Sequence, residues 1–159
     1  MKKTLLIALL TLFGACTTTS NARLNLDRRG VALEGYDPVS YHRPTGPVKG
    51  RPEHSAAHAG ATYWFADQAS RTRFLRSPDY YEPLYGGWCA YAMIEGDKVE
   101  VDPTCYMLTS RGLFLFYKSV LIDTRERWQR ADHDQQKAQA DRHWSELERE
   151  RALAPQPSS

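Results

Sequence analysis

The fold is decided by the stretch Ala61-Thr62-Tyr63-Trp64-Phe65, which leads within two residues into Gln68–Arg76. The first part is β-branched and aromatic, which is typical of a β-strand. Asp67 can accept hydrogen bonds from the first backbone N–H groups of a following helix, and Ser77-Pro78 stops that helix. A strand followed at once by a short helix predicts an α+β fold with one central helix.

N-terminal to this stretch, the sequence contains several segments that are typical of turns. Short apolar stretches, Leu24-Asn25-Leu26 and Val31-Ala32-Leu33, flank the turn-like Asp27–Gly30 and predict an opening strand or hairpin. Gly35–Tyr41 then changes the direction of the chain. The segment from Arg43 to Gly60 holds three prolines and three glycines, so we expect it to be mostly loop.

Toward the C-terminus short strand patterns give way to helix formers. The strand candidates are Lys98–Val101, Cys105–Leu108 and Leu113–Tyr117, with a tight turn at Ser110-Arg111-Gly112. From Ile122 to about Ala152 the charges are balanced, and a thin apolar stripe is formed by Trp128, Ala131, Ala138, Trp144 and Leu147. Asp132-His133-Asp134 could cap a second helix within this segment. The sequence therefore predicts a small antiparallel sheet, a central helix and a C-terminal helix or helix pair.

The N-terminal segment has the pattern of an export signal. Met1-Lys2-Lys3 is basic, and Thr4–Ala15 is an apolar run too short to span a bilayer. We divide the chain into a signal peptide (1–15), a tether (16–23), the folded domain (24–152) and a disordered tail (153–159). No later segment has the length and hydropathy of a membrane span.

Two cleavage sites compete, and they predict different membrane attachment. Leu12–Cys16 is similar to a bacterial lipobox, in which Cys16 would be lipidated and would anchor the protein to a membrane. Ser20-Asn21-Ala22 would instead release a soluble periplasmic protein. We expect the first, a periplasmic lipoprotein.

Removal of the signal also changes the charge balance. Without Lys2 and Lys3 the 21 basic residues fall to the number of acidic residues, 19. No basic stripe remains, so the composition excludes a nucleic-acid partner. Lipidation of Cys16 leaves Cys89 and Cys105, and an oxidising periplasm would permit a disulfide between them. The alternative is a buried thiol at Cys89 and an incidental one at Cys105.

Three motifs carry a resemblance to a known family. They are Gly35–Tyr41 (GYDPVSY), Gly60–Ala66 (GATYWFA) and Tyr85–Met93 (YGGWCAYAM), and the similarity extends through Lys98–Pro103, Leu113–Tyr117, Ala140-Asp141 and Trp144. In these motifs the chain resembles exported bacterial YHS-domain proteins. The resemblance covers nearly all of the chain after the signal.

The resemblance implies metal binding for the wider family, with cysteine ligands that this chain lacks. YHS domains are associated with metals such as copper through a cysteine two residues after Asp-Pro and a Phe-Cys-x-x-x-Cys pair. Here the first cysteine is replaced by Ser40, the methionine that often follows by His42, and the paired cysteines by Ala66 and Ser70. The resemblance therefore supports the fold more than it supports a metal at the usual place.

Other residues could still hold a metal ion. Cys89 and Met93 form a Cys-x-x-x-Met pattern that would place two soft donors for copper(I) on one face of a helix. The alternative is that both are ordinary core residues beside Gly86-Gly87. His54 and His58 would share one face of a helix and, with His42 nearby, could hold copper(II) or zinc; the alternative is surface histidines without a ligand.

We find no catalytic motif and expect a protein that is not an enzyme. The predicted role is metal binding or handling in the periplasm, with a copper ion as the candidate cofactor. The first alternative is a metal-free interaction module for an envelope protein partner, for which the aromatic patch Tyr80–Tyr91 could serve. The second is a thiol/disulfide redox role through Cys89 and Cys105.

Overall fold

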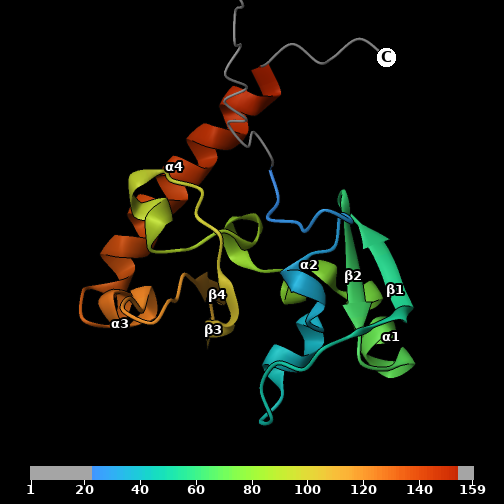
Figure 1. Cartoon of the computed structure of the whole chain (residues 1–159). Coiled ribbons are helices and arrows are strands. Elements are labelled where there is room, and N and C mark those ends of the chain that lie inside the picture. The colour runs from blue at the N-terminus through green and yellow to red at the C-terminus, as the bar shows by residue number, and fades with distance from the viewer. Residues whose placement is uncertain (1–22, 154–159) are drawn as a thin grey trace, which may run out of the picture.

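The computed structural model describes residues 23–153 and has the expected α+β class (Figure 1). It contains two two-stranded antiparallel sheets and a long C-terminal helix. The predicted signal peptide, both candidate cleavage sites, the candidate lipidation site Cys16 and nearly all of the predicted tether lie outside the described residues, as does the tail after 153. Among the described helices, none combines the length and apolar character needed to cross a membrane.

The first sheet is a hairpin of β1 (Arg51–His58) and β2 (Ala61–Phe65). The prediction of a strand over 61–65 is confirmed, whereas the prediction of loop over 43–60 is wrong for 51–58. Proline is tolerated in edge strands and at bulges, and the pairing of β1 with β2 shifts register between Arg51 and Ser55, the interval that contains Pro52. The tight turn at Ala59-Gly60 has positive φ at both residues, as a two-residue hairpin requires.

Helices follow the first sheet directly. α1 spans Gln68–Arg76, and the Asp67 side chain accepts a hydrogen bond from the Ser70 N–H, as predicted. α2 (Pro78–Tyr81) begins with proline, which is well suited to the first position of a helix. Short 3-10 helices lie at Leu33–Gly35, Pro38–His42, Leu84–Gly87 and Ala92–Glu95.

The second sheet is a hairpin of β3 (Asp102–Thr109) and β4 (Gly112–Phe116). Two of the three strand candidates thus lie in it. Lys98–Val101 is not a strand: Val99 accepts a hydrogen bond from the Cys89 N–H outside any ladder. The expected single sheet is divided in two because the helices and turns between Phe65 and Asp102 separate the hairpins.

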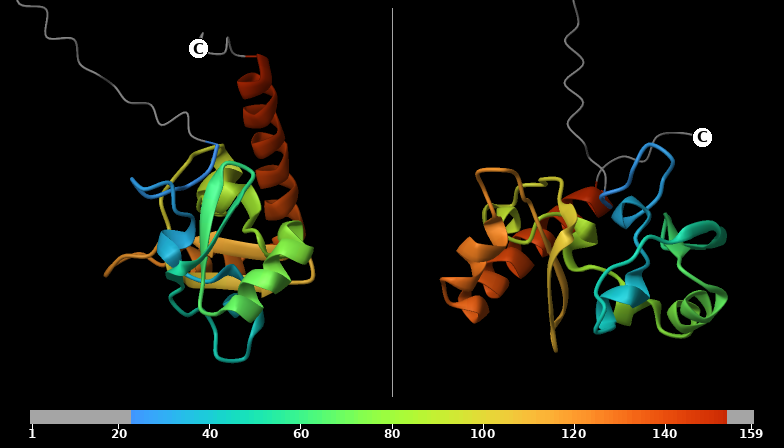
Figure 2. Two further views of the ribbon diagram at one scale, coloured as in Figure 1. Left: turned by 90° about the vertical axis from the view of Figure 1, so that its right-hand side faces the viewer. Right: turned by 60° about the horizontal axis from the view of Figure 1, so that its bottom comes forward.

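The C-terminal helix pair is confirmed as α3 (Thr124–Gln129) and α4 (His133–Leu153), with Asp132 accepting hydrogen bonds at the start of α4. Figure 2 shows the β3–β4 hairpin between these helices and the N-terminal half of the described chain. Two hydrophobic cores result. The first core includes Tyr41, Tyr63, Phe65, Phe74, Leu113 and Leu115. The second core includes Met93, Cys105, Phe114, Phe116, Trp128 and Ala140.

Strand β4 joins the two cores. Side chains alternate between the two faces of a strand, so Leu113 and Leu115 pack in the first core while Phe114 and Phe116 pack in the second. All four are buried. A strand that is apolar on both faces is therefore needed here, and the sequence Leu-Phe-Leu-Phe supplies it.

Candidate functional site

Two of the three positions that the expected YHS resemblance would assign to cysteine ligands, Ser40 and Ala66, lie beside a buried carboxylate. Asp37 is fully buried, and its carboxylate accepts hydrogen bonds from the Val39 N–H at 2.9 Å and the Ala66 N–H at 3.1 Å. The Ser40 hydroxyl donates to the Asp37 carbonyl and accepts from the Val48 N–H at 3.0 Å. We call this arrangement the Asp37 network; its polar groups are satisfied by the chain itself.

The third of these positions, Ser70, is held by an arginine. The Arg43 guanidinium donates to the Ser70 hydroxyl and lies 4.0 Å from the Asp67 carboxylate. A guanidinium is always charged and repels a metal cation. Ser40, Ala66 and Ser70 are thus held by hydrogen bonds to Asp37 and Arg43.

Cys89 and Met93 are placed as core residues. Both are fully buried, and the Cys89 sulfur lies 3.4 Å from the Thr124 hydroxyl and accepts a hydrogen bond from the Tyr117 N–H. The Met93 N–H bonds to the Cys89 carbonyl, so the two residues are one turn apart, as the spacing suggested. Among the described residues, no cluster of three or more His, Cys, Asp or Glu ligands includes Cys89.

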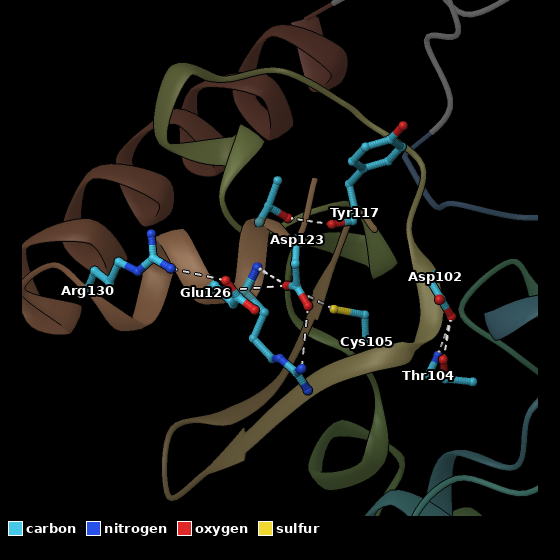
Figure 3. A network of polar contacts seen from close by, with 9 residues as sticks. Asp102, Thr104, Cys105, Tyr117, Asp123, Glu126 and Arg130 are labelled. Atoms are coloured by element: carbon cyan, nitrogen blue, oxygen red, sulfur yellow. Dashed lines mark hydrogen bonds and ion pairs between the residues drawn. The ribbon is translucent and has the colours of Figure 1, made fainter. Parts of the chain in front are cut away.

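The two cysteines in the described part of the chain, Cys89 and Cys105, are free thiols in this structure. Figure 3 shows the Cys105 sulfur directed at Asp123, to which it donates a hydrogen bond of 3.5 Å. Asp123 also caps α3 by accepting from the Arg125 N–H at 2.9 Å. Burial, together with the neighbouring Asp123 carboxylate, raises the pKa of Cys105 to about 11. The thiol is therefore protonated at neutral pH, which is unfavourable for redox exchange.

The three candidate histidines do not meet one another or Cys89. His54 and His58 lie on a strand rather than a helix, and four residues of strand separate their Cα atoms by about 13 Å. The ring of His42 packs on Tyr80 and Tyr81, with centroids 4.7 and 5.0 Å away. Desolvation lowers the pKa of His42.

His58 alone meets other ligating side chains. It ends β1, while Asp79 lies in α2 and Glu82 directly follows that helix. One ligand atom from each of these three residues lies within 4.8 Å of the other two. His58 Nε2 lies 3.7 Å from Glu82 Oε1. We call these residues the His58 cluster.

Neighbouring residues hold the His58 cluster in place. The Tyr63 hydroxyl donates to Glu82 Oε1 at 3.0 Å, and burial together with the neighbouring Glu82 carboxylate raises the pKa of Tyr63 far above its usual range. The His58 ring meets the edge of Phe74, with centroids 5.9 Å apart. The cluster is still accessible, because the side chains of His58 and Glu82 are 32% and 25% exposed and Asp79 is exposed.

Sequence reasoning found His58 but missed its partners. Asp79 and Glu82 are three residues apart, a spacing that places side chains on one face of a helix. Glu82 lies within the aromatic patch and Asp79 directly precedes it, and the sequence offers no signal that connects either residue with His58. No protein-family model, no curated protein and no solved structure matches this chain.

Proposed function

We propose that this chain is an exported, non-catalytic protein that binds a divalent transition-metal ion, Cu²⁺ or Zn²⁺, at the His58 cluster. One observation carries the proposal: an imidazole and two carboxylates from separate elements have their ligand atoms within 4.8 Å of one another. Ligands around a tetrahedral zinc ion lie roughly 3.3 Å apart. His58 Nε2 and Glu82 Oε1 already lie 3.7 Å apart, and the exposed Asp79 side chain completes the set within 4.8 Å.

The type of ligand selects among metals. Imidazole and carboxylate suit Cu²⁺ and Zn²⁺, whereas copper(I) prefers thiolate and thioether. The soft donors Cys89 and Met93 are fully buried and engaged in the interior. Copper therefore remains a candidate cofactor, but as Cu²⁺ at the His58 cluster rather than as copper(I) at Cys89 and Met93.

Two further features favour a metal over an empty cluster. The Tyr63 hydroxyl donates to Glu82 and holds its carboxylate in place, as outer hydrogen bonds commonly do for metal-binding carboxylates. A pocket of ≈ 250 Å³ adjoins the cluster and is lined in part by Ala59, Asp79 and Glu82. It leaves space for water or another small ligand at the positions that three protein ligands do not fill.

The test is calorimetric titration of the purified mature protein with Zn²⁺ and, separately, with Cu²⁺. We expect one ion per chain, and we expect His58→Ala and Asp79→Asn each to weaken binding by about 10-fold or more. His54→Ala is the matched control, because it removes an imidazole from the same strand outside the cluster. A stoichiometry well below one, or an equal loss in His54→Ala, would overturn the proposal.

A metal-free envelope interaction module is the second candidate, and one observation favours it. Val120 and Leu121, in the turn between β4 and α3, are 101% and 92% exposed. The turn itself is ordered by a hydrogen bond from the Ser119 N–H to the Ile122 carbonyl. Exposed aliphatic side chains on a fixed turn are typical of contact surfaces. In this case crosslinking in cells would give an adduct of defined mass that Val120→Ser with Leu121→Ser abolishes and His58→Ala retains.

A further inference from the structure

A cavity of ≈ 460 Å³ lies where the N-terminal segment of the described chain meets the residues just before β3. Small-molecule sites in proteins commonly have volumes of about 300–1,000 Å³. The lining residues are Asn25–Arg29, Leu33, Glu34, Gly87, Glu100, Val101, Pro103 and Leu115. We call this space the Arg28 cavity. It shares no residue with the His58 cluster.

The inner part of the Arg28 cavity is apolar. Leu33, Pro103 and Leu115 line it and are buried. The half-buried side chains of Leu26 and Val101 extend this apolar surface toward the solvent. An aliphatic group that packed on these residues would be removed from water, which is favourable.

The outer part of the cavity carries charges of both signs. Arg28, Glu34 and Glu100 line the cavity and are exposed, so they lie at its mouth. Within residues 23–153, none of these three forms an ion pair. The other two charged lining residues, Asp27 and Arg29, pair with each other at 2.8 Å. One guanidinium and two carboxylates are therefore available to a ligand that itself carries both charges.

The backbone at Glu34 is strained. Leu33 and Glu34 have φ values of 56° and 49°, a region that side chains other than glycine rarely adopt. The turn is held by the Tyr36 N–H, which donates to the Leu33 carbonyl at 2.9 Å, and by the Lys49 ammonium, which donates to the Glu34 carbonyl at 2.7 Å. Strain of this kind gathers at functional sites. Glycine would fit the turn without strain, so the glutamate is better explained by its side chain than by its backbone.

We propose that the Arg28 cavity binds a zwitterionic amino acid with an apolar side chain. Its carboxylate meets Arg28, whose planar guanidinium can hold both carboxylate oxygens. Its ammonium meets Glu34 and Glu100, and its side chain packs on the apolar inner part of the cavity. The site needs no bound metal and does not depend on the His58 cluster.

The test is a titration of the ¹⁵N-labelled mature protein with L-leucine, followed at the backbone amide signals. We expect saturable movement of the signals of Arg28, Glu34 and Val101, with those of α4 unchanged. N-acetyl-L-leucine lacks the ammonium and L-leucinamide lacks the carboxylate, so each should bind about 5-fold or more weakly than L-leucine.

Substitutions at the mouth assign each end of the ligand. Arg28→Gln should weaken L-leucine binding by about 5-fold or more but should not weaken L-leucinamide binding, because that ligand has no carboxylate. Glu100→Gln should weaken L-leucine binding but not N-acetyl-L-leucine binding. Arg76→Gln is the matched control, because it removes an exposed arginine of α1 outside the cavity. Arg76→Gln and His58→Ala should both leave L-leucine binding unchanged.

Glu34→Gly separates the ligand from the fold. Because glycine relieves the backbone strain, we expect this variant to unfold at a higher urea concentration than wild type while it binds L-leucine more weakly. The proposal would be overturned by the absence of a saturable shift at millimolar L-leucine, by equal losses in Arg28→Gln and Arg76→Gln, or by unchanged L-leucine binding in Glu34→Gly.

Discussion

The Asp37 network and the His58 cluster lie in the same half of the chain and use carboxylates in opposite ways. Asp37 is fully buried, and both of its carboxylate oxygens accept backbone N–H groups. In the His58 cluster, Glu82 accepts from Tyr63 but faces an imidazole and a second carboxylate at an accessible surface. The comparison indicates that a closed network stabilises the fold, whereas an open one is available to a ligand.

The substitution with the largest expected effect on the Asp37 network is Asp37→Ala. It leaves the buried N–H group of Val39 and the part-buried N–H group of Ala66 without an acceptor, so we expect the free energy of unfolding to fall by about 3–5 kcal/mol. Urea unfolding measures this loss. The matched control Asp79→Ala, which removes the exposed carboxylate of the open cluster, should change stability by less than about 0.5 kcal/mol. Similar losses of unfolding free energy in Asp37→Ala and Asp79→Ala would contradict the proposed difference between the Asp37 network and the His58 cluster.

If the His58 cluster binds a metal ion, adding the ion should stabilise the folded protein. At a free Cu²⁺ or Zn²⁺ concentration 100 times the dissociation constant, the folded protein should gain about 2.7 kcal/mol. Thermal unfolding with metal and with a chelator measures the gain, which His58→Ala should abolish. The gain should shrink at acid pH, because protons compete with the metal for imidazole. If the metal stabilised His58→Ala as much as the wild type, the ion would have to bind outside the His58 cluster.

A smaller effect is expected at Asp67, which borders the closed network. The backbone hydrogen bond from Ser70 is the main contact that holds the pKa of Asp67 below its usual value. Because the folded-state pKa is the lower one, the stabilisation is complete above the unfolded-state pKa and is lost as pH falls through the folded-state pKa. Asp67→Ala should cost about 1 kcal/mol at neutral pH, and the difference from wild type should vanish in strong acid. Asp67→Asn, which keeps a capping oxygen, should cost less; a pH-independent difference for Asp67→Ala would contradict the assignment.

Local signals explain what the sequence predicted well. The strand at 61–65 and the helix at 68–76 have their expected bounds, because β-branched residues and the Asp67 cap act within a few positions. Strand β1 was missed because Pro52 and its neighbouring glycines resemble a loop, and only pairing with β2 makes the segment a strand. The division of the expected sheet into two likewise depends on how the helices and turns between Phe65 and Asp102 pack, which no short stretch of sequence specifies.

The candidate site was predicted less completely for the same reason. His58 was selected on the assumption of a helix, but it meets Asp79 and Glu82 because the β1–β2 hairpin brings the end of β1 beside α2. The spacing between His58 and Asp79 carries no local signal. Conversely, the Cys-x-x-x-Met pattern was local and formed the expected turn, yet burial removed both donors from the surface. Local patterns predicted the backbone, while access to a side chain depended on the tertiary fold.

The smallest expected effect concerns the thiols of Cys89 and Cys105, which lie in the C-terminal half of the described chain. Cys105 is buried and its pKa is raised to about 11, so roughly one thiol in a thousand is ionised at about pH 8. We expect neither Cys105 nor the fully buried Cys89 to react with iodoacetamide in the folded protein, and both to react after unfolding in urea. A third reactive cysteine in unfolded protein would be an unmodified, uncleaved Cys16. Rapid labelling of folded Cys105, or a Cys89–Cys105 disulfide in protein isolated from cells, would instead favour the redox role, because it would show that this closed region opens under native conditions.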